Sequence, residues 1–294
     1  MNLEQQQPKI FAYFKTILKK QLISHAYLFS GEFASFEMAL YVAKSLFCSN
    51  PSKDHEPCLV CRSCRLIDER EFLDLKVIEP TGNMIKTETV REFIHDFSYS
   101  GLEGKRQVFI IKDAEKMHPN AANSLLKFIE NPQKDIYIIL ITSDVNKILP
   151  TIRSRCQVFY FKKNSQFIKD YLESKGIFSS QALKLAELVS DVAEAKKWSE
   201  NQKWLDNMKE IELAVGAIVA NQPMAYLRIA KLSDKIQEKE EQQLTFKLMV
   251  ILLKDVEDSL KRDKLLKKIY HAQKMWQANV SFQNALEYMV LDQS

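Results

Sequence analysis

Residues 31 to 38 have the spacing of a phosphate-binding loop but lack the residue types that bind phosphate. In the template Gly-x-x-x-x-Gly-Lys-[Ser/Thr], glycines let backbone N–H groups close on the phosphates, the lysine holds the outer phosphates, and the hydroxyl ligates Mg²⁺. Counted from Gly31, the second glycine is replaced by Phe36 and the lysine by Glu37. Met38 replaces the hydroxyl residue. A carboxylate repels a triphosphate and the phenyl ring fills the space of the cradle, so we expect no ATP to be bound here.

A second remnant of ATPase chemistry follows the apolar segment 108–112. In an ATPase an aspartate at this place holds Mg²⁺, and the glutamate after it polarises the attacking water. Here Asp113 is followed by Ala114, and Glu115 comes one residue too late. We therefore expect Asp113 to cap the segment that follows.

Four cysteines are spaced as metal ligands. They are Cys48, Cys58, Cys61 and Cys64, the last three in a C-x₂-C-x₂-C pattern. Four clustered thiols in a reducing compartment favour tetrahedral zinc, and four thiolates leave no open position for catalysis. We expect a structural zinc site, with free buried thiols or redox chemistry as alternatives. His55 lies in the same segment and is expected to be a solvated loop residue.

Arg155 stands in the sequence Ser154-Arg155-Cys156, in the loop before the last expected strand. An arginine delivered to a neighbouring subunit's γ-phosphate stabilises the charge that develops during hydrolysis, and it needs no nucleotide of its own. A loop arginine is more often a surface ion-pair partner. The residues around Arg155 leave both interpretations open.

The elements that must position these residues follow an α/β pattern. Apolar strands are expected at 27–30, 74–79, 108–112, 136–141 and 157–161, with helical periodicity between them. This alternation is typical of a parallel sheet. We expect an α/β domain over 1–161 with a zinc-binding insertion at 48–64, a small helical domain over 162–203, and an all-helical domain over 204–294.

Length and composition fit an ordinary globular protein of two or three domains. The chain has 294 residues, of which 46% are hydrophobic and 27% charged, with a net charge of +4. That charge does not require a nucleic-acid partner. The N-terminus has no secretory pattern, and no apolar run approaches about 18 residues. We expect a cytoplasmic protein that makes no membrane contact.

Several motifs together resemble the bacterial sliding-clamp loader of the DNA polymerase III holoenzyme. They are the segments 27–31, 123–132 and 151–156 and the four cysteines. The resemblance covers about 30–160 closely, and the helical remainder fits in length and order. It implies an AAA+ module, a lid domain and a C-terminal collar domain that assembles a ring. We expect the helices from 204 onward to carry most of that association.

Within this family, Phe36, Glu37, Met38 and Ala114 depart from the pattern of the ATP-hydrolysing subunits. The chain is therefore similar to the subunit type that binds no ATP yet supplies an arginine finger in trans, which implies this role for Arg155. The implied partners are gamma/tau and delta subunits, the beta sliding clamp, and primed DNA reached through the assembled ring. Such a chain is not catalytic alone, but it is part of a DNA-directed DNA polymerase complex in DNA replication.

Two other functions are alternatives that fit the sequence less well. An ATP-hydrolysing gamma/tau-type subunit must keep the lysine and the Mg²⁺-ligating hydroxyl, and this sequence has neither. A zinc-containing nucleic-acid-binding module needs a basic or aromatic face around its cysteines. Arg62 and Arg65 interleave with the cysteines, but acidic residues surround them, which favours a structural knob or a protein contact. The acidic residues are Asp54, Glu56, Asp68 and Glu69.

Overall fold

A computed structural model describes residues 3–92, 106–130 and 135–291. They form two compact units, Met1–Asn164 and Ser165–Ser294. Within these residues no helix combines the length and the apolar character that crossing a bilayer requires. Of the motifs named above, Asn131 and Pro132 lie outside the described residues. The expected division of the helical part at residue 203 stays a prediction.

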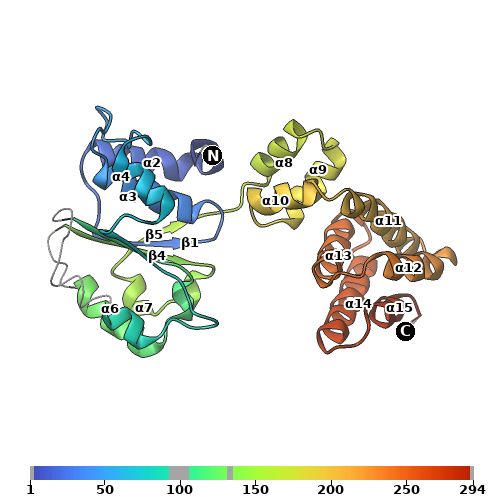
Figure 1. Cartoon of the computed structure of the whole chain (residues 1–294). Coiled ribbons are helices and arrows are strands. Elements are labelled where there is room, and N and C mark those ends of the chain that lie inside the picture. The colour runs from blue at the N-terminus through green and yellow to red at the C-terminus, as the bar shows by residue number, and fades with distance from the viewer. Residues whose placement is uncertain (1–2, 93–105, 131–134, 292–294) are drawn as a thin grey trace. The chain divides into compact units, whose positions relative to one another are not determined.

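The first unit is built on a five-stranded sheet in which every pair of neighbours is parallel, so the expected parallel α/β sheet is confirmed (Figure 1). The strands are β1 (Ala26–Ser30), β2 (Leu75–Ile78), β3 (Gln107–Ile111), β4 (Ile136–Thr142) and β5 (Gln157–Tyr160). Their order across the sheet is β2-β3-β4-β1-β5. The chain order therefore reverses around β1, and the segments that follow β1, β3 and β4 meet at one edge.

Helices cover both faces of this sheet (Figure 1). The helices of the first unit are α1 (Leu3–Gln6), α2 (Pro8–Lys19), α3 (Ser35–Phe47), α4 (Arg62–Glu69), α6 (Pro119–Glu130) and α7 (Pro150–Arg153), with 3₁₀ turns η1 (Ala114–Lys116) and η2 (Val145–Lys147). Residues 87–92 are helical as well. One core lies beneath α2 and α3 and the other beneath α6 and α7. Because both faces are covered, the first four residues of β1 are all buried rather than alternating, and only Ser30 at its end is partly exposed.

The second unit is entirely helical in its described part. Its helices are α8 (Ser165–Ser174), α9 (Ser179–Leu188), α10 (Val192–Ser199), α11 (Gln202–Val219), α12 (Met224–Lys235), α13 (Lys239–Leu252), α14 (Ser259–Gln277) and α15 (Phe282–Leu291), with the 3₁₀ turn η3 (Leu253–Asp255). Helix α13 ends at Leu252 and α14 begins at Ser259, with η3 between them.

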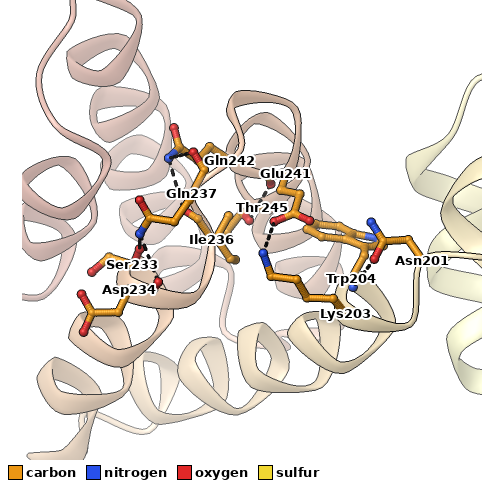
Figure 2. A network of polar contacts seen from close by, with 10 residues as sticks. All are labelled: Asn201, Lys203, Trp204, Ser233, Asp234, Ile236, Gln237, Glu241, Gln242 and Thr245. Carbon is orange, nitrogen blue, oxygen red and sulfur yellow. Dashed lines mark hydrogen bonds and ion pairs between the residues drawn. The ribbon is translucent and has the colours of Figure 1, made fainter.

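A polar network ties α11 to α13 (Figure 2). The Asn201 side chain accepts a hydrogen bond from the backbone N–H of Trp204 at 3.0 Å and so caps α11. Lys203 reaches the buried carboxylate of Glu241 at 3.8 Å, and the Thr245 hydroxyl donates to the carbonyl of Glu241 at 2.8 Å. These contacts fix the first turn of α11 against α13.

Candidate functional site

The turn after β1 requires a glycine for reasons that do not involve phosphate. Gly31 has a φ of +108°, and a Cβ placed on it would lie 2.1 Å from the backbone oxygen of Phe161. Its N–H donates to the carbonyl of Thr142 at 2.8 Å. The close approach of the chain after β5 therefore explains why this position is glycine.

The loop between Gly31 and α3 is fastened by the protein's own groups. The side-chain amide of Gln7 donates to the backbone carbonyl of Phe33 at 2.9 Å and to that of Lys162 at 2.8 Å. Phe33 and Ala34 are buried, and Ala34 adopts a left-handed conformation with a φ of +63°. The loop thus has its shape without a bound anion.

Phe36, in the first turn of α3 and at the sequence position of the second glycine, has two cations over its ring. The guanidinium carbon of Arg70 lies 5.0 Å from the ring centroid and the Nζ of Lys112 lies 4.9 Å from it. Both cations bind the same Glu79 oxygen at 3.0 Å. The hydrogen bond from Lys112 is the main cause that holds the pKa of Glu79 below its ordinary value. We call Phe36, Arg70, Glu79 and Lys112 the aromatic clamp.

The other two positions of the degenerate loop diverge in space. Met38 is fully buried in the core beneath α2 and α3. Glu37 is exposed, and its charge is therefore presented to solvent at the first turn of α3. Glu37 therefore supplies no cation for a phosphate, and Met38 supplies no hydroxyl for Mg²⁺.

The end of β3 differs from the sequence-based expectation. Asp113 precedes the 3₁₀ turn η1, but its side chain makes no capping hydrogen bond and instead pairs with Lys116 at 2.9 Å. The cap prediction was wrong, because an ion pair within the turn takes the carboxylate. The residue that directly follows β3 is Lys112, whose role in the aromatic clamp the sequence reasoning missed. In the sequence, Lys112 stands beside the acidic residues Asp113 and Glu115, and this pattern does not predict a contact with an aromatic ring.

Glu115 is turned toward the end of β4. Its carboxylate accepts hydrogen bonds from the hydroxyl and from the backbone N–H of Ser143. Burial opposes ionisation, but these hydrogen bonds hold the pKa of Glu115 below its ordinary value. The carboxylate that an ATPase would aim at water is here a link between β3 and β4.

The four cysteines converge as the spacing predicts. The sulfurs of Cys48, Cys58, Cys61 and Cys64 all lie within 4.8 Å of one another. The sulfurs of Cys48 and Cys61 are 3.9 Å apart, close to the edge of a tetrahedron with Zn–S bonds of about 2.3 Å. Backbone N–H groups of Val60 and Cys61 hold the pKa of Cys58 below its ordinary value. The donor set fits one zinc ion closed by four thiolates.

Two of the acidic residues around the cysteines form ion pairs within the first unit. Glu56 pairs with Lys15 at 2.9 Å and Asp54 pairs with Lys19 at 2.9 Å, which fastens the cysteine segment to α2. His55 faces Gln21 across 2.8 Å and is not among the ligands, as expected. These ion pairs therefore hold the cysteine segment against the first unit.

Arg155 follows α7 and is exposed. Its guanidinium donates to the carbonyl of Thr151 at 3.0 Å and pairs with Glu130, at the end of α6, at 2.8 Å. The two side chains are 41% and 42% exposed. Burial raises the pKa of the adjacent Cys156 to about 12, which keeps that sulfur a neutral thiol. Arg155 is thus a surface cation held by an exposed ion pair and by hydrogen bonds to its own loop.

Comparisons with known proteins identify the family. The family model described as "DNA polymerase III, delta subunit" matches residues 6–165. The delta-prime subunit of DNA polymerase III from Bacillus subtilis is 30% identical over 315 residues, covering 97% of this chain and 95% of the relative. The tau subunit from Escherichia coli is 34% identical over 142 residues, covering 48% of this chain and 22% of the relative.

A solved structure shows the same fold. A DNA polymerase III gamma-subunit-related protein from Thermotoga maritima aligns with a TM-score of 0.50 at 16% identity, covering 95% of this chain and 96% of that one. The resemblance inferred from the sequence motifs is confirmed. The chain belongs to the delta-prime family of bacterial DNA polymerase III clamp-loader subunits.

Proposed function

We propose that this chain is the clamp-loader subunit that binds no ATP and is not catalytic by itself. The observation that carries the proposal is the aromatic clamp, in which Phe36, at the sequence position of the second glycine, has two paired cations over its ring. Met38 is committed to the core, so no Mg²⁺-ligating hydroxyl stands at its place. The protein's own groups, Gly31 and Gln7, fasten the loop to the chain after β5.

We propose further that Arg155 acts as an arginine finger on a nucleotide held by a neighbouring gamma/tau subunit. Its side chain is exposed, and the ion pair with Glu130 is of the surface kind that contributes about 0–1 kcal/mol. That tie is weak enough to be exchanged for a phosphate. A guanidinium offers the planar, bidentate donors that a γ-phosphate in the transition state can use.

The proposed assembly contains gamma/tau and delta subunits, opens the beta clamp and places it on primed DNA. We assign association to the collar, residues 204–294, and a lid role to 162–203. Support for the collar comes from exposed apolar side chains on α11 and α12, namely Leu213, Met224 and Leu227, each more than half exposed. The substitutions Leu213→Glu and Leu227→Glu should weaken the incorporation of this chain into the complex. Native mass spectrometry measures that incorporation.

The zinc ion is proposed to be structural. It would be held by Cys48, Cys58, Cys61 and Cys64 and would supply a cross-link between the end of α3 and the start of α4. The cysteine segment is fastened to α2 by ion pairs, so the metal adds rigidity to a knob that already has a fixed place. Its chemistry is not used for catalysis, because all four positions are filled.

Two measurements test the proposal. Calorimetric titration of the isolated chain with Mg-ATP should show no binding up to about millimolar concentration, and a micromolar dissociation constant would refute the first part. In a reconstituted ring, Arg155→Ala should slow hydrolysis at the adjacent site by on the order of 10³–10⁵, with less effect on total turnover because other interfaces remain. Arg153→Ala, on an exposed arginine two residues away, is the matched control.

Arg155→Lys should rescue poorly, because an ammonium lacks the planar fork of guanidinium. Unchanged clamp- and DNA-stimulated turnover in the Arg155→Ala ring would return this residue to the role of a surface ion-pair partner.

A further inference from the structure

The positive charge of this protein is concentrated on one helix. Helix α14 contains six basic residues and one acidic residue, Asp263. The basic residues are Lys261, Arg262, Lys264, Lys267, Lys268 and Lys274. The whole chain has a net charge of only +4, so the remainder is close to neutral. Helix α14 therefore has a net charge of +5, from six basic residues and one acidic residue, in an otherwise nearly neutral molecule.

One face of α14 is committed to the bundle. Ile269 and Ala272 are buried, and the indole N–H of Trp276 donates to the side chain of Gln242 at 2.8 Å. α14 runs beside α13 and α15 (Figure 1). At 100° per residue, Lys264, Lys267 and Lys274 lie on the opposite side of the helix, and all three are exposed. We call these three lysines, with Tyr270, the α14 basic face.

Several lysines on other helices of the second unit are neutralised by ion pairs. On neighbouring helices, Lys184 pairs with Glu212 and Lys235 pairs with Glu210, each at 2.8 Å. Lys264 and Lys267 have no ion-pair partner among the described residues. The Nζ of Lys274 lies 4.7 Å from the ring centroid of Tyr270, which is 59% exposed. The face thus presents three lysines beside a half-exposed aromatic ring, and its charge stays net positive although the exposed carboxylate of Asp263 lies on the same side of the helix.

We infer that the α14 basic face binds single-stranded DNA. At 1.5 Å rise per residue it extends about 15 Å from Lys264 to Lys274, long enough to meet several successive phosphates. Lysine is a point charge that suits a flexible phosphodiester chain, whereas planar carboxylates favour arginine. The exposed Tyr270 adds a ring on which any base can stack. This site goes beyond the proposed function and is independent of Arg155.

The test uses the full chain and fluorescence anisotropy with labelled oligothymidylate, titrated at several salt concentrations. Each phosphate neutralised on a single strand contributes about −0.7 to the slope of log affinity against log salt concentration. The triple variant Lys264→Gln/Lys267→Gln/Lys274→Gln should therefore reduce the magnitude of that slope by about 2. The matched control is Lys231→Gln/Lys239→Gln/Lys247→Gln, an equal charge change on exposed lysines of α12 and α13. It should leave the slope unchanged.

Tyr270→Ala should weaken oligothymidylate binding about five- to hundredfold, and Tyr270→Phe should retain it, because stacking needs the ring and not the hydroxyl. The inference is overturned if the triple variant keeps the wild-type affinity and slope, or if the control loses as much. It is overturned also if Tyr270→Ala has no effect while duplex DNA binds as tightly as the single strand. Equal competition by polyglutamate would instead assign the face to an acidic protein partner and exclude DNA.

Discussion

Gly31→Ala should strongly destabilise the first unit, although we propose that the loop that contains Gly31 binds no phosphate. The new Cβ would lie 2.1 Å from the backbone oxygen of Phe161, where ordinary contact begins near 3.4 Å. The atom in the way belongs to the backbone after β5, so no side-chain rotation relieves the contact. Either β5 or the turn after β1 must shift by about 1 Å.

The magnitude follows from what that shift disrupts. A φ of +108° is costly for alanine, by at least about 1–2 kcal/mol. The hydrogen bonds from Phe161 N–H to Ser30 and from Gly31 N–H to Thr142, at 2.7 and 2.8 Å, lie at the point of movement. Each contributes about 0.5–1.5 kcal/mol. We expect a loss of about 3–5 kcal/mol in the free energy of unfolding, a large part of a typical domain's stability.

The assay must separate the two units. All three tryptophans, Trp198, Trp204 and Trp276, lie in the second unit, so tryptophan fluorescence reports unfolding there. Hydrogen exchange followed by mass spectrometry on peptides of β1 and β5 reports the first unit. Gly31→Ala should accelerate exchange in β1 and β5 and leave the tryptophan transition in urea unchanged. Mg-ATP should not alter either result.

Gly82→Ala is the matched control. Gly82 also has a positive φ, +71°, but no atom lies within 4 Å of a Cβ built on it. Gly82→Ala should therefore lower the free energy of unfolding only by the cost of a positive φ for alanine, about 1–2 kcal/mol. If Gly31→Ala costs no more than Gly82→Ala, the steric argument is wrong and the glycine is not retained for the approach of the chain after β5.

Three further predictions concern the aromatic clamp, the proposed zinc site and Arg155. Glu79→Gln should make the stability of the first unit less sensitive to acid. The lowered pKa of Glu79 stabilises the fold at neutral pH, and this contribution is lost as the pH falls below about 4.5. Hydrogen exchange of the first unit, measured at each pH, checks the prediction. Cys58→Ala should abolish stoichiometric zinc and loosen residues 48–64 more than the sheet, checked by metal analysis and limited proteolysis; full zinc occupancy would contradict the site. Glu130→Gln should raise neighbouring ATP turnover by at most about fivefold by releasing Arg155, whereas a fall in turnover would mean that Glu130 positions the finger.

Sequence reasoning was most successful where one chemical type repeats at a fixed spacing. The apolar strands and the C-x₂-C-x₂-C pattern each depend on short-range periodicity, so the parallel sheet and the cysteine cluster could be predicted. The cap predicted for Asp113 was wrong because Lys116, three residues on, competes for its carboxylate. Helix α14 gave no apolar stripe, because few of its side chains enter the bundle.

The sequence by itself determined which atoms are present: a phosphate loop without lysine or hydroxyl, four thiols, and an arginine before the last strand. Only the tertiary structure decided what replaces the missing chemistry. Arg70, Glu79 and Lys112 are far apart along the chain and meet over Phe36 because α4, β2 and β3 end near the start of α3. The pairing of Arg155 with Glu130 is equally long-range. Such contacts depend on how separate elements are placed, which local propensity and spacing do not encode.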